Sequence, residues 1–109
     1  IDDKDYLFVK TEYRMEKVSF DDILYIEGMG DYRNVQTTNK KILTLQTFGE
    51  LEKYLPKDKF CRVHKSYLVS IGQIEFVERN RIKIGEKRIP ISETYKNIFF
   101  ELIGFSNRK

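Results

Sequence analysis

Three polar residues of different chemistry stand side by side in the middle of the sequence: His64, Lys65 and Ser66. They offer an imidazole nitrogen, an ammonium group and a hydroxyl, which are groups that proteins use to hold phosphates and to read base edges. The apolar residues around them alternate with a period of two, and Lys65 breaks that alternation. The pattern therefore favours two short strands, over 61–63 and 67–71, that meet at an exposed polar step. A polar turn without a function explains the same spacing equally well.

A second group of such side chains follows two closely spaced glycines in residues 28–31, which predict a bulge or a sharp loop. Tyr32, Arg33 and Asn34 come directly after this loop. An arginine can bond bidentately to guanine, and an asparagine to adenine. The alternative is that Tyr32 belongs to the core and that Asn34 is an ordinary strand residue.

Residues 79–88 form a strongly basic stretch with five Lys or Arg and one acid. The alternation here predicts a hairpin with Arg81 and Lys83 on one face and isoleucines on the other. Such a hairpin can anchor phosphates, or its charges can simply protect a sheet edge from pairing. At the start of the last predicted helix, the backbone N–H groups of Glu93 and Thr94 can also hold a phosphate.

The charge distribution agrees with a nucleic-acid partner. The net charge of +3 combines a balance of −5 over residues 1–31 with a balance of +8 over residues 32–109. This asymmetry indicates an acidic entry segment and a basic working surface. An uneven scatter of ordinary surface charges is the simpler explanation, and the pI near 8.9 lies just under the usual threshold of about 9 for a basic domain.

Other classes of function find little support. One cysteine and one histidine cannot supply a structural zinc site or an internal disulfide, so no metal is expected and a reducing, cytoplasmic location is favoured. Cys61 and His64 are three apart on a predicted strand and point to opposite faces, and no nucleophile motif is present. We therefore predict no enzymatic activity and no cofactor. No apolar run reaches the ~20 residues of a membrane helix, and no signal peptide is seen.

The 109 residues suffice for one domain, and the elements that must position these groups are mostly strands. The third expected strand is continuously apolar and is therefore predicted to be central. About ten short strands in antiparallel hairpins with two short helices predict a mainly β domain. The expected strands cover residues 6–10, 14–18, 23–27, 32–37, 41–45, 61–63, 67–71, 74–78, 81–84 and 87–90.

Two segments have the period of a helix. Near 48–55, Thr47 and Glu50 have the spacing of a capping box and Pro56 marks the end. Near 93–103, Ser92 is the expected N-cap and Gly104 the stop. The second helix carries an amphipathic stripe, from which Phe100 is absent. The stripe consists of Tyr95, Ile98, Phe99, Leu102 and Ile103.

Three segments, 22–27, 60–69 and Ile91-Ser92, together resemble the LytTR DNA-binding domain over about residues 6–104. The resemblance implies an elongated fold of small antiparallel sheets, with residues 1–5 as a linker remnant and 105–109 as a tail. It implies the output domain of a bacterial response regulator, preceded by a receiver domain. Such domains insert loops into successive major grooves of double-stranded DNA at paired direct repeats. We expect a monomer off DNA and two copies on DNA.

The resemblance also implies roles for the residues introduced above. The loop after the third strand, the His-Lys-Ser step and the start of the last helix are base-reading elements of the family. The base-reading candidates are Tyr32, Arg33, Asn34, Lys65 and Thr94. The phosphate-contact candidates are Arg62, His64, Ser66, Arg79, Arg81, Lys83, Lys87, Arg88, Ser92 and Lys96.

Two positions depart from the family pattern. Ser70 stands where asparagine is usual, and Glu93-Thr94 stands where basic residues are common. These departures motivate an alternative in which the chain is a protein-interaction or ligand-sensing β module that has lost DNA recognition. Single-stranded nucleic-acid binding by exposed aromatic residues is a further alternative.

Overall fold

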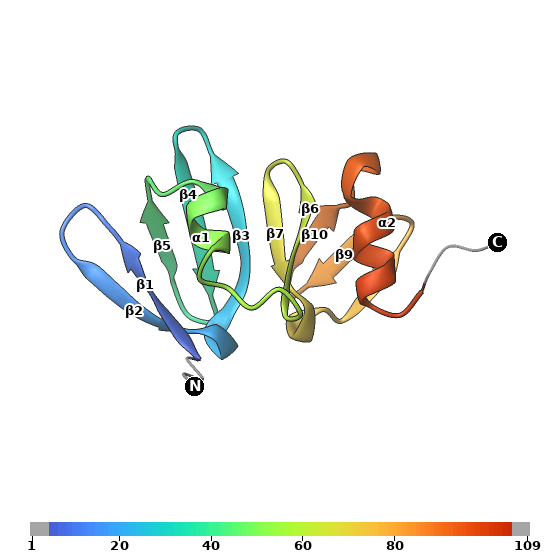
Figure 1. The fold of residues 1–109 in the computed structure, drawn as a ribbon, viewed down its shortest axis with the longest axis horizontal. Helices are drawn as coiled ribbons and strands as arrows, with labels where there is room; N and C mark the ends of the chain where they lie inside the picture. The colour runs from blue at the N-terminus through green and yellow to red at the C-terminus, as the bar shows by residue number, and fades with distance from the viewer. Residues whose placement is uncertain (1–4, 106–109) are drawn as a thin grey trace.

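The computed structural model describes residues 5–105. They form ten strands, arranged in three antiparallel sheets, and two α-helices (Figure 1). The ten strands confirm the predicted mainly β architecture. The extents of 49 × 36 × 23 Å confirm its elongated shape. The predicted linker and tail lie outside the described residues, apart from Asp5 and Phe105.

A five-stranded sheet stands in the middle of the molecule, in the order β5-β4-β3-β7-β6. On β3, Ile26 pairs with Leu68 and faces one hydrophobic core, whereas Tyr25 pairs with Val69 and faces another. Successive strand residues point to opposite faces, so a strand between two cores must be apolar on both. This confirms β3 as a central strand. The strands are β3 (Ile23–Met29), β4 (Tyr32–Thr37), β5 (Lys41–Thr44), β6 (Phe60–His64) and β7 (Tyr67–Ser70).

The first core lies under a small hairpin and a short helix. The hairpin pairs β1 (Tyr6–Lys10) with β2 (Met15–Ser19), and a 3₁₀ turn (Phe20–Asp22) leads into the central sheet. Helix α1 (Phe48–Glu52) covers the same face. The hairpin and α1 supply five of the thirteen buried apolar residues of this core.

The second core lies on the opposite face, under a three-stranded sheet and the C-terminal helix (Figure 1). Its largest fully buried side chain is Phe99. The covering elements are a 3₁₀ turn (Ile71–Gln73), β8 (Phe76–Glu78), β9 (Arg81–Ile84), β10 (Lys87–Pro90) and α2 (Glu93–Leu102). The chain thus encloses its central sheet between an N-terminal and a C-terminal layer.

The capping box of α1 is present as predicted, with Thr47 accepting from the Glu50 backbone N–H and Glu50 accepting from the Thr47 N–H. The helix ends at Glu52, three residues earlier than expected. The backbone N–H of Leu55 bonds the Glu52 carbonyl, so the chain tightens into a turn before Pro56. A residue that precedes proline is disfavoured in the helical conformation, which explains the early end.

The face that α2 buries differs from the predicted stripe. Ile98 and Leu102 are 63% and 37% exposed, whereas Phe100 packs against the Phe99 ring at 5.3 Å between centroids. Because α2 covers one end of an elongated molecule, only a narrow strip of its surface meets the core. Periodicity gives the width of an apolar stripe but not which edge of it is covered.

The loop after β3 also comes later than expected. β3 continues through Gly28 to Met29, and the turn occupies Gly30 and Asp31. Gly30 has φ of +65°, which a glycine adopts without strain. The predicted 79–80 turn is present, and both of its residues have positive φ, as a tight hairpin turn requires.

Candidate nucleic-acid interface

Three connections meet at one edge of the molecule: the β3–β4 turn, the β6–β7 turn and the start of α2 (Figure 1, upper edge). Two backbone hydrogen bonds tie them together. The Gly28 N–H donates to the Ser66 carbonyl, and the Ser92 N–H donates to the Val63 carbonyl, each at 2.9 Å. Segments whose bonded residues are 38 and 29 positions apart in sequence therefore form one continuous surface, which we call the three-loop edge.

The β6–β7 turn is held in place by the guanidinium of Arg62. Its Nε donates to the His64 carbonyl at 3.0 Å and its Nη2 to the Lys65 carbonyl at 2.7 Å. The Ser66 N–H donates to His64 Nδ1 at 3.0 Å, so the imidazole also stabilises the turn. Since these groups bond to the backbone, the side chain of Lys65 is left exposed at the tip.

Arg62 is also enclosed by aromatic rings from both helices. Its guanidinium carbon lies 4.1 Å from the centre of the Phe48 ring and 5.5 Å from that of Tyr95. Nη1 lies 3.9 Å from a carboxylate oxygen of Glu52. Stacking and backbone hydrogen bonds therefore let Arg62 position the turn, and its phosphate contact stays a prediction. No pattern in the sequence indicated that the Phe48 ring stacks on the Arg62 guanidinium.

A pocket of about 450 Å³ lies between the β3–β4 and β6–β7 turns. Arg33 forms one wall, with its guanidinium carbon 5.4 Å from the centre of the Phe48 ring. Its Nε is enclosed and has no hydrogen-bond partner among the described residues. Tyr32, by contrast, is 42% exposed. The residues that line the pocket are Gly28, Gly30, Arg33, Thr47, Phe48, Gly49, Arg62, Lys65 and Ser66.

Asn34 departs from the predicted base-reading set because it is completely buried. Its Nδ2 donates to Glu27 at 3.0 Å and to Gln36 at 3.2 Å. Reaching a base would require breaking both hydrogen bonds and exposing the packed strand. Asn34 is therefore an interior residue of β4, in agreement with the alternative that it is an ordinary strand residue.

At the start of α2, Ser92 is the N-cap but its side chain makes no capping hydrogen bond. Thr94 is exposed, and the carboxylate of Glu93 lies 3.6 Å from Lys96 Nζ. The acid at this unusual position is thus partly balanced by the next turn of the helix. Ser70, the other departure from the family pattern, is buried at the end of β7, away from the three-loop edge.

The basic hairpin is largely neutralised by nearby carboxylates. Lys83 lies 3.4 Å from Glu75, and Lys87 lies 3.2 Å from Glu27. Burial lowers the pKa of Lys87, but the hydrogen bond and charge of Glu27 outweigh burial and raise it overall. Arg88 faces Glu78 at 4.0 Å, an exposed and weak pair.

Arg79 and Arg81 are exposed and form no ion pair within residues 5–105. The structure therefore separates the predicted phosphate contacts into neutralised and available cations. Sequence reasoning missed Glu27 as the partner of Lys87, because the two residues lie on elements far apart in the chain. No local spacing could have revealed this pair.

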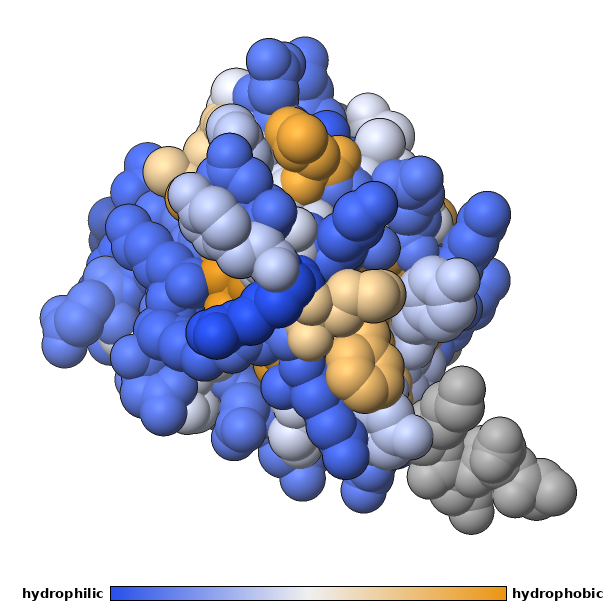
Figure 2. All heavy atoms as spheres, turned by 90° about the vertical axis from the view of Figure 1, so that its left-hand side faces the viewer, coloured by the Kyte–Doolittle hydropathy of each residue, from blue (hydrophilic) through white to orange (hydrophobic). Residues whose placement is uncertain are grey.

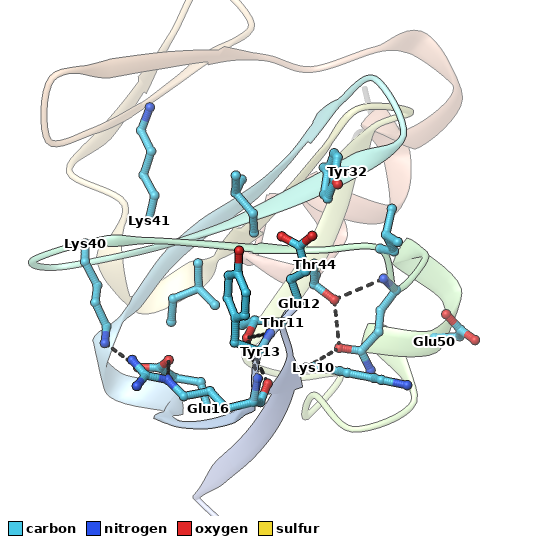
Figure 3. A pocket seen from close by; sticks show the side chains of 15 residues that line it. Lys10, Thr11, Glu12, Tyr13, Glu16, Tyr32, Lys40, Lys41, Thr44 and Glu50 are labelled. Atoms are coloured by element: carbon cyan, nitrogen blue, oxygen red, sulfur yellow. Dashed lines mark hydrogen bonds and ion pairs between the residues drawn. The ribbon is translucent and has the colours of Figure 1, made fainter.

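A second concavity, of about 990 Å³, lies between the β1–β2 hairpin and β5. Figure 3 shows the Tyr13 ring rising from the hairpin turn toward β5, with Lys40 and Glu16 in contact. Figure 2 shows this side of the molecule as mainly hydrophilic, with small separate hydrophobic areas. The exposed apolar residues of these elements include Phe8, Met15, Leu43 and Leu45.

Chemistry of other kinds is poorly supported by the geometry. Over residues 5–105, no group of three His, Cys, Asp or Glu side chains is arranged to hold a metal ion. Cys61 is buried, and burial together with the Glu52 charge raises its pKa to about 11, so its reactive thiolate is scarce at neutral pH. In this same part of the chain, no helix is long and apolar enough to cross a membrane.

Comparison with known proteins agrees with this fold. A model of the LytTr DNA-binding domain matches residues 13–104, so the chain belongs to the LytTR family of DNA-binding domains, which is not a family of enzymes. A solved LytTr DNA-binding domain from Bacillus cereus superposes with a TM-score of 0.80 at 26% identity. The superposition covers 94% of this chain and 100% of that one.

Longer proteins contain similar segments. The sensory transduction protein LytT of Bacillus anthracis is 31% identical over 95 residues, covering 82% of this chain and 39% of that protein. The transcriptional regulatory protein NatR of Bacillus subtilis is 28% identical over 69 residues, covering 63% of this chain and 30% of that protein. The chain thus spans less than half the length of these relatives.

Proposed function

We propose that this chain is a sequence-specific, double-stranded DNA-binding domain that reads major grooves with its three-loop edge. The observation that carries the proposal is the joining of three loops at one edge, where Lys65 is exposed and Arg33 has no carboxylate partner. Membership of a family of DNA-binding domains supports the same conclusion.

Exposure divides the roles along this edge. Tyr32, Lys65 and Thr94 are the proposed base readers, because their side chains are exposed at the three loops. Phosphate contacts come from the hydroxyls and cations nearby and fix the register of the domain on the duplex. The proposed phosphate contacts include Ser66, Arg79, Arg81 and Ser92. Lys83, Lys87, Arg88 and Lys96 contribute less, since each faces a carboxylate.

We further propose that the chain is the cytoplasmic output part of a bacterial response regulator with an N-terminal receiver domain. The support is its similarity to part of the longer LytT and NatR proteins. A monomer would bind each of two direct repeats, so that two copies occupy one operator. Binding to repeats requires no stable dimer in solution.

The test is selection of duplexes from a random library with the purified domain, in parallel with Lys65→Ala and with Lys59→Ala as a control. Lys59 is an exposed lysine at the opposite end of β6, so its loss removes the same charge away from the proposed site. We expect a short repeated motif that Lys65→Ala relaxes and Lys59→Ala preserves. Equal recovery of all sequences by the folded domain would contradict sequence-specific recognition.

The alternative is an interaction or ligand-sensing module, and the groove between the β1–β2 hairpin and β5 favours it. Its exposed Tyr13, Leu43 and Leu45 offer apolar contact area that DNA reading does not use. Failure to enrich any sequence, even at low salt where phosphate contacts are strongest, would move the assignment to this alternative.

A further inference from the structure

The pocket between the β3–β4 and β6–β7 turns has the composition of an anion site. Arg33, Arg62 and Lys65 place three positive charges around it, and its lining contains no carboxylate. Thr47 and Ser66 add hydroxyl groups to the walls. Among the described residues, the one acid paired with any of these cations is Glu52, 3.9 Å from Arg62, and it does not line the pocket. A negatively charged ligand would therefore meet an uncompensated field here.

The three cations differ in how free they are. Arg62 already donates to the carbonyls of His64 and Lys65, and it lies over Phe48 and near Tyr95. Arg33 makes no ion pair and no side-chain hydrogen bond among the described residues, and its Nε is enclosed. Because its side chain is bonded to no acceptor among the described residues, the guanidinium remains free to donate to an anion in the pocket.

The chemistry of the pocket favours phosphate among anions. A guanidinium presents parallel N–H donors that match two phosphate oxygens, and hydroxyls can donate to a third. The guanidinium carbon of Arg33 lies 5.4 Å from the centre of the Phe48 ring, so the side chain already lies in the pocket wall before a ligand arrives. A half-buried arginine in this position is also poorly placed to extend into a groove and read a base edge.

We propose that this pocket seats a single phosphate group and that Arg33 anchors it. The proposal deepens the DNA-binding function and rests on it for the source of the phosphate, which is either a DNA backbone diester or a free phosphorylated small molecule. On DNA, Arg33 would fix the backbone between two loops and carry no sequence information, while Lys65 beside it reads bases. This changes the role of Arg33 from base reader to backbone anchor.

The first arm of the test measures the anion directly by NMR. A ¹⁵N-labelled domain is titrated with inorganic phosphate at constant ionic strength, and the Arg33 Nε–H and the amides of Gly28, Gly49 and Ser66 are followed. We expect saturable shifts at these groups, lost in Arg33→Gln and kept in Lys59→Ala. The spectrum of Arg33→Gln before titration shows whether the variant is folded. Shifts that do not saturate, or that persist in a folded Arg33→Gln, would overturn the proposal.

The second arm identifies the source with a duplex obtained from the selection experiment. Uncharged methylphosphonate linkages replace the phosphates one position at a time. If the phosphate comes from the DNA backbone, replacement at one position weakens binding of the parent domain about tenfold and does not change binding of Arg33→Gln. Arg33→Gln then lowers affinity equally for all sequences and reduces the salt slope by about 0.9. Saturable phosphate binding without such a position assigns the pocket to a free phosphorylated molecule.

The two proposals fail separately. If the domain selects no DNA sequence but phosphate saturates the pocket, the DNA function is wrong and the anion site stands. If the domain selects a motif but Arg33→Gln relaxes base preference at one position instead of weakening all sequences, Arg33 is a base reader and the anchor role is wrong. We expect Lys65→Ala to lose sequence preference, and Arg33→Gln to lower the affinity for all sequences by the same factor.

Discussion

Two basic regions of this molecule look alike in sequence and differ in the folded chain. The 79–88 hairpin carries five basic residues, but its Lys83, Lys87 and Arg88 each face a carboxylate, and only Arg79 and Arg81 are unpaired within residues 5–105. At the three-loop edge, Arg33 and Lys65 have no carboxylate partner within residues 5–105. The density of Lys and Arg therefore does not measure how much positive charge is available to a ligand; the acids that the fold brings alongside decide it.

The difference follows from where the two regions pack. The hairpin lies against the central sheet, and Lys87 crosses the rings of Tyr25 and Tyr67 to reach Glu27. A cation held against a sheet must be paired to offset its desolvation. The β6–β7 turn projects from the end of the sheet, so Lys65 can stay hydrated while Arg62 stabilises the turn through its backbone.

The largest expected effect concerns Arg62. Arg62→Ala removes two charge-assisted hydrogen bonds to turn carbonyls and the stacking on Phe48, so we expect the free energy of unfolding to fall by about 2–4 kcal/mol. Arg81→Ala, which removes an exposed and unpaired guanidinium from the hairpin, should change it by at most about 0.5 kcal/mol. Urea denaturation of both variants measures the contrast. Equal losses would show that the turn is not held by Arg62.

An intermediate effect is expected on DNA affinity. Lys65→Ala should weaken binding to the selected duplex about tenfold, in the range of one base contact. Lys83→Ala should change it by less than about twofold, because Glu75 already neutralises that ammonium. Fluorescence anisotropy titrations at one fixed salt concentration compare the two. A loss in Lys83→Ala as large as in Lys65→Ala would mean that Lys83 contacts DNA in spite of its pairing with Glu75.

The smallest effect concerns the pairing of Lys87 with Glu27. Glu27→Gln keeps an acceptor for Asn34 but removes the charge, so the pKa of Lys87 should fall in an NMR titration. A lysine pKa raised by folding contributes stability that is complete below the unfolded value of about 10.4 and is lost as pH rises through the folded value. The stability gap between the parent and Glu27→Gln should therefore be widest at neutral pH and close as pH rises through the raised pKa of Lys87.

Comparing the two proteins at the same pH removes the titration of Cys61, whose pKa burial raises and which both proteins contain. The pKa of Tyr25 is raised by burial and by the charge of Glu27, so Glu27→Gln changes this titration as well. A stability gap that does not change with pH would indicate that Glu27 acts through packing alone. In that case the hairpin cations would not be neutralised as the distances suggest.

Much of the fold was predictable because its signals are local. Apolar alternation over four or five residues placed most strands within one or two residues of their observed bounds, and the Thr47–Glu50 capping box was correct. The motif 60–69 indicated the family that the match over residues 13–104 confirms. The end of α1, the loop after β3 and the buried side of α2 were misplaced, because packing against other elements decides each of them.

The sequence by itself determined the strand order along the chain, the capping box of α1, the single cysteine and the presence of three polar loops. Only the tertiary structure decided which charges remain available: it buried Asn34, used Arg62 to hold a turn and paired Lys87 with Glu27. The physical reason is range. A strand or a cap is stabilised by neighbours a few residues away, whereas the state of a charge depends on groups that become neighbours only when distant segments have packed together.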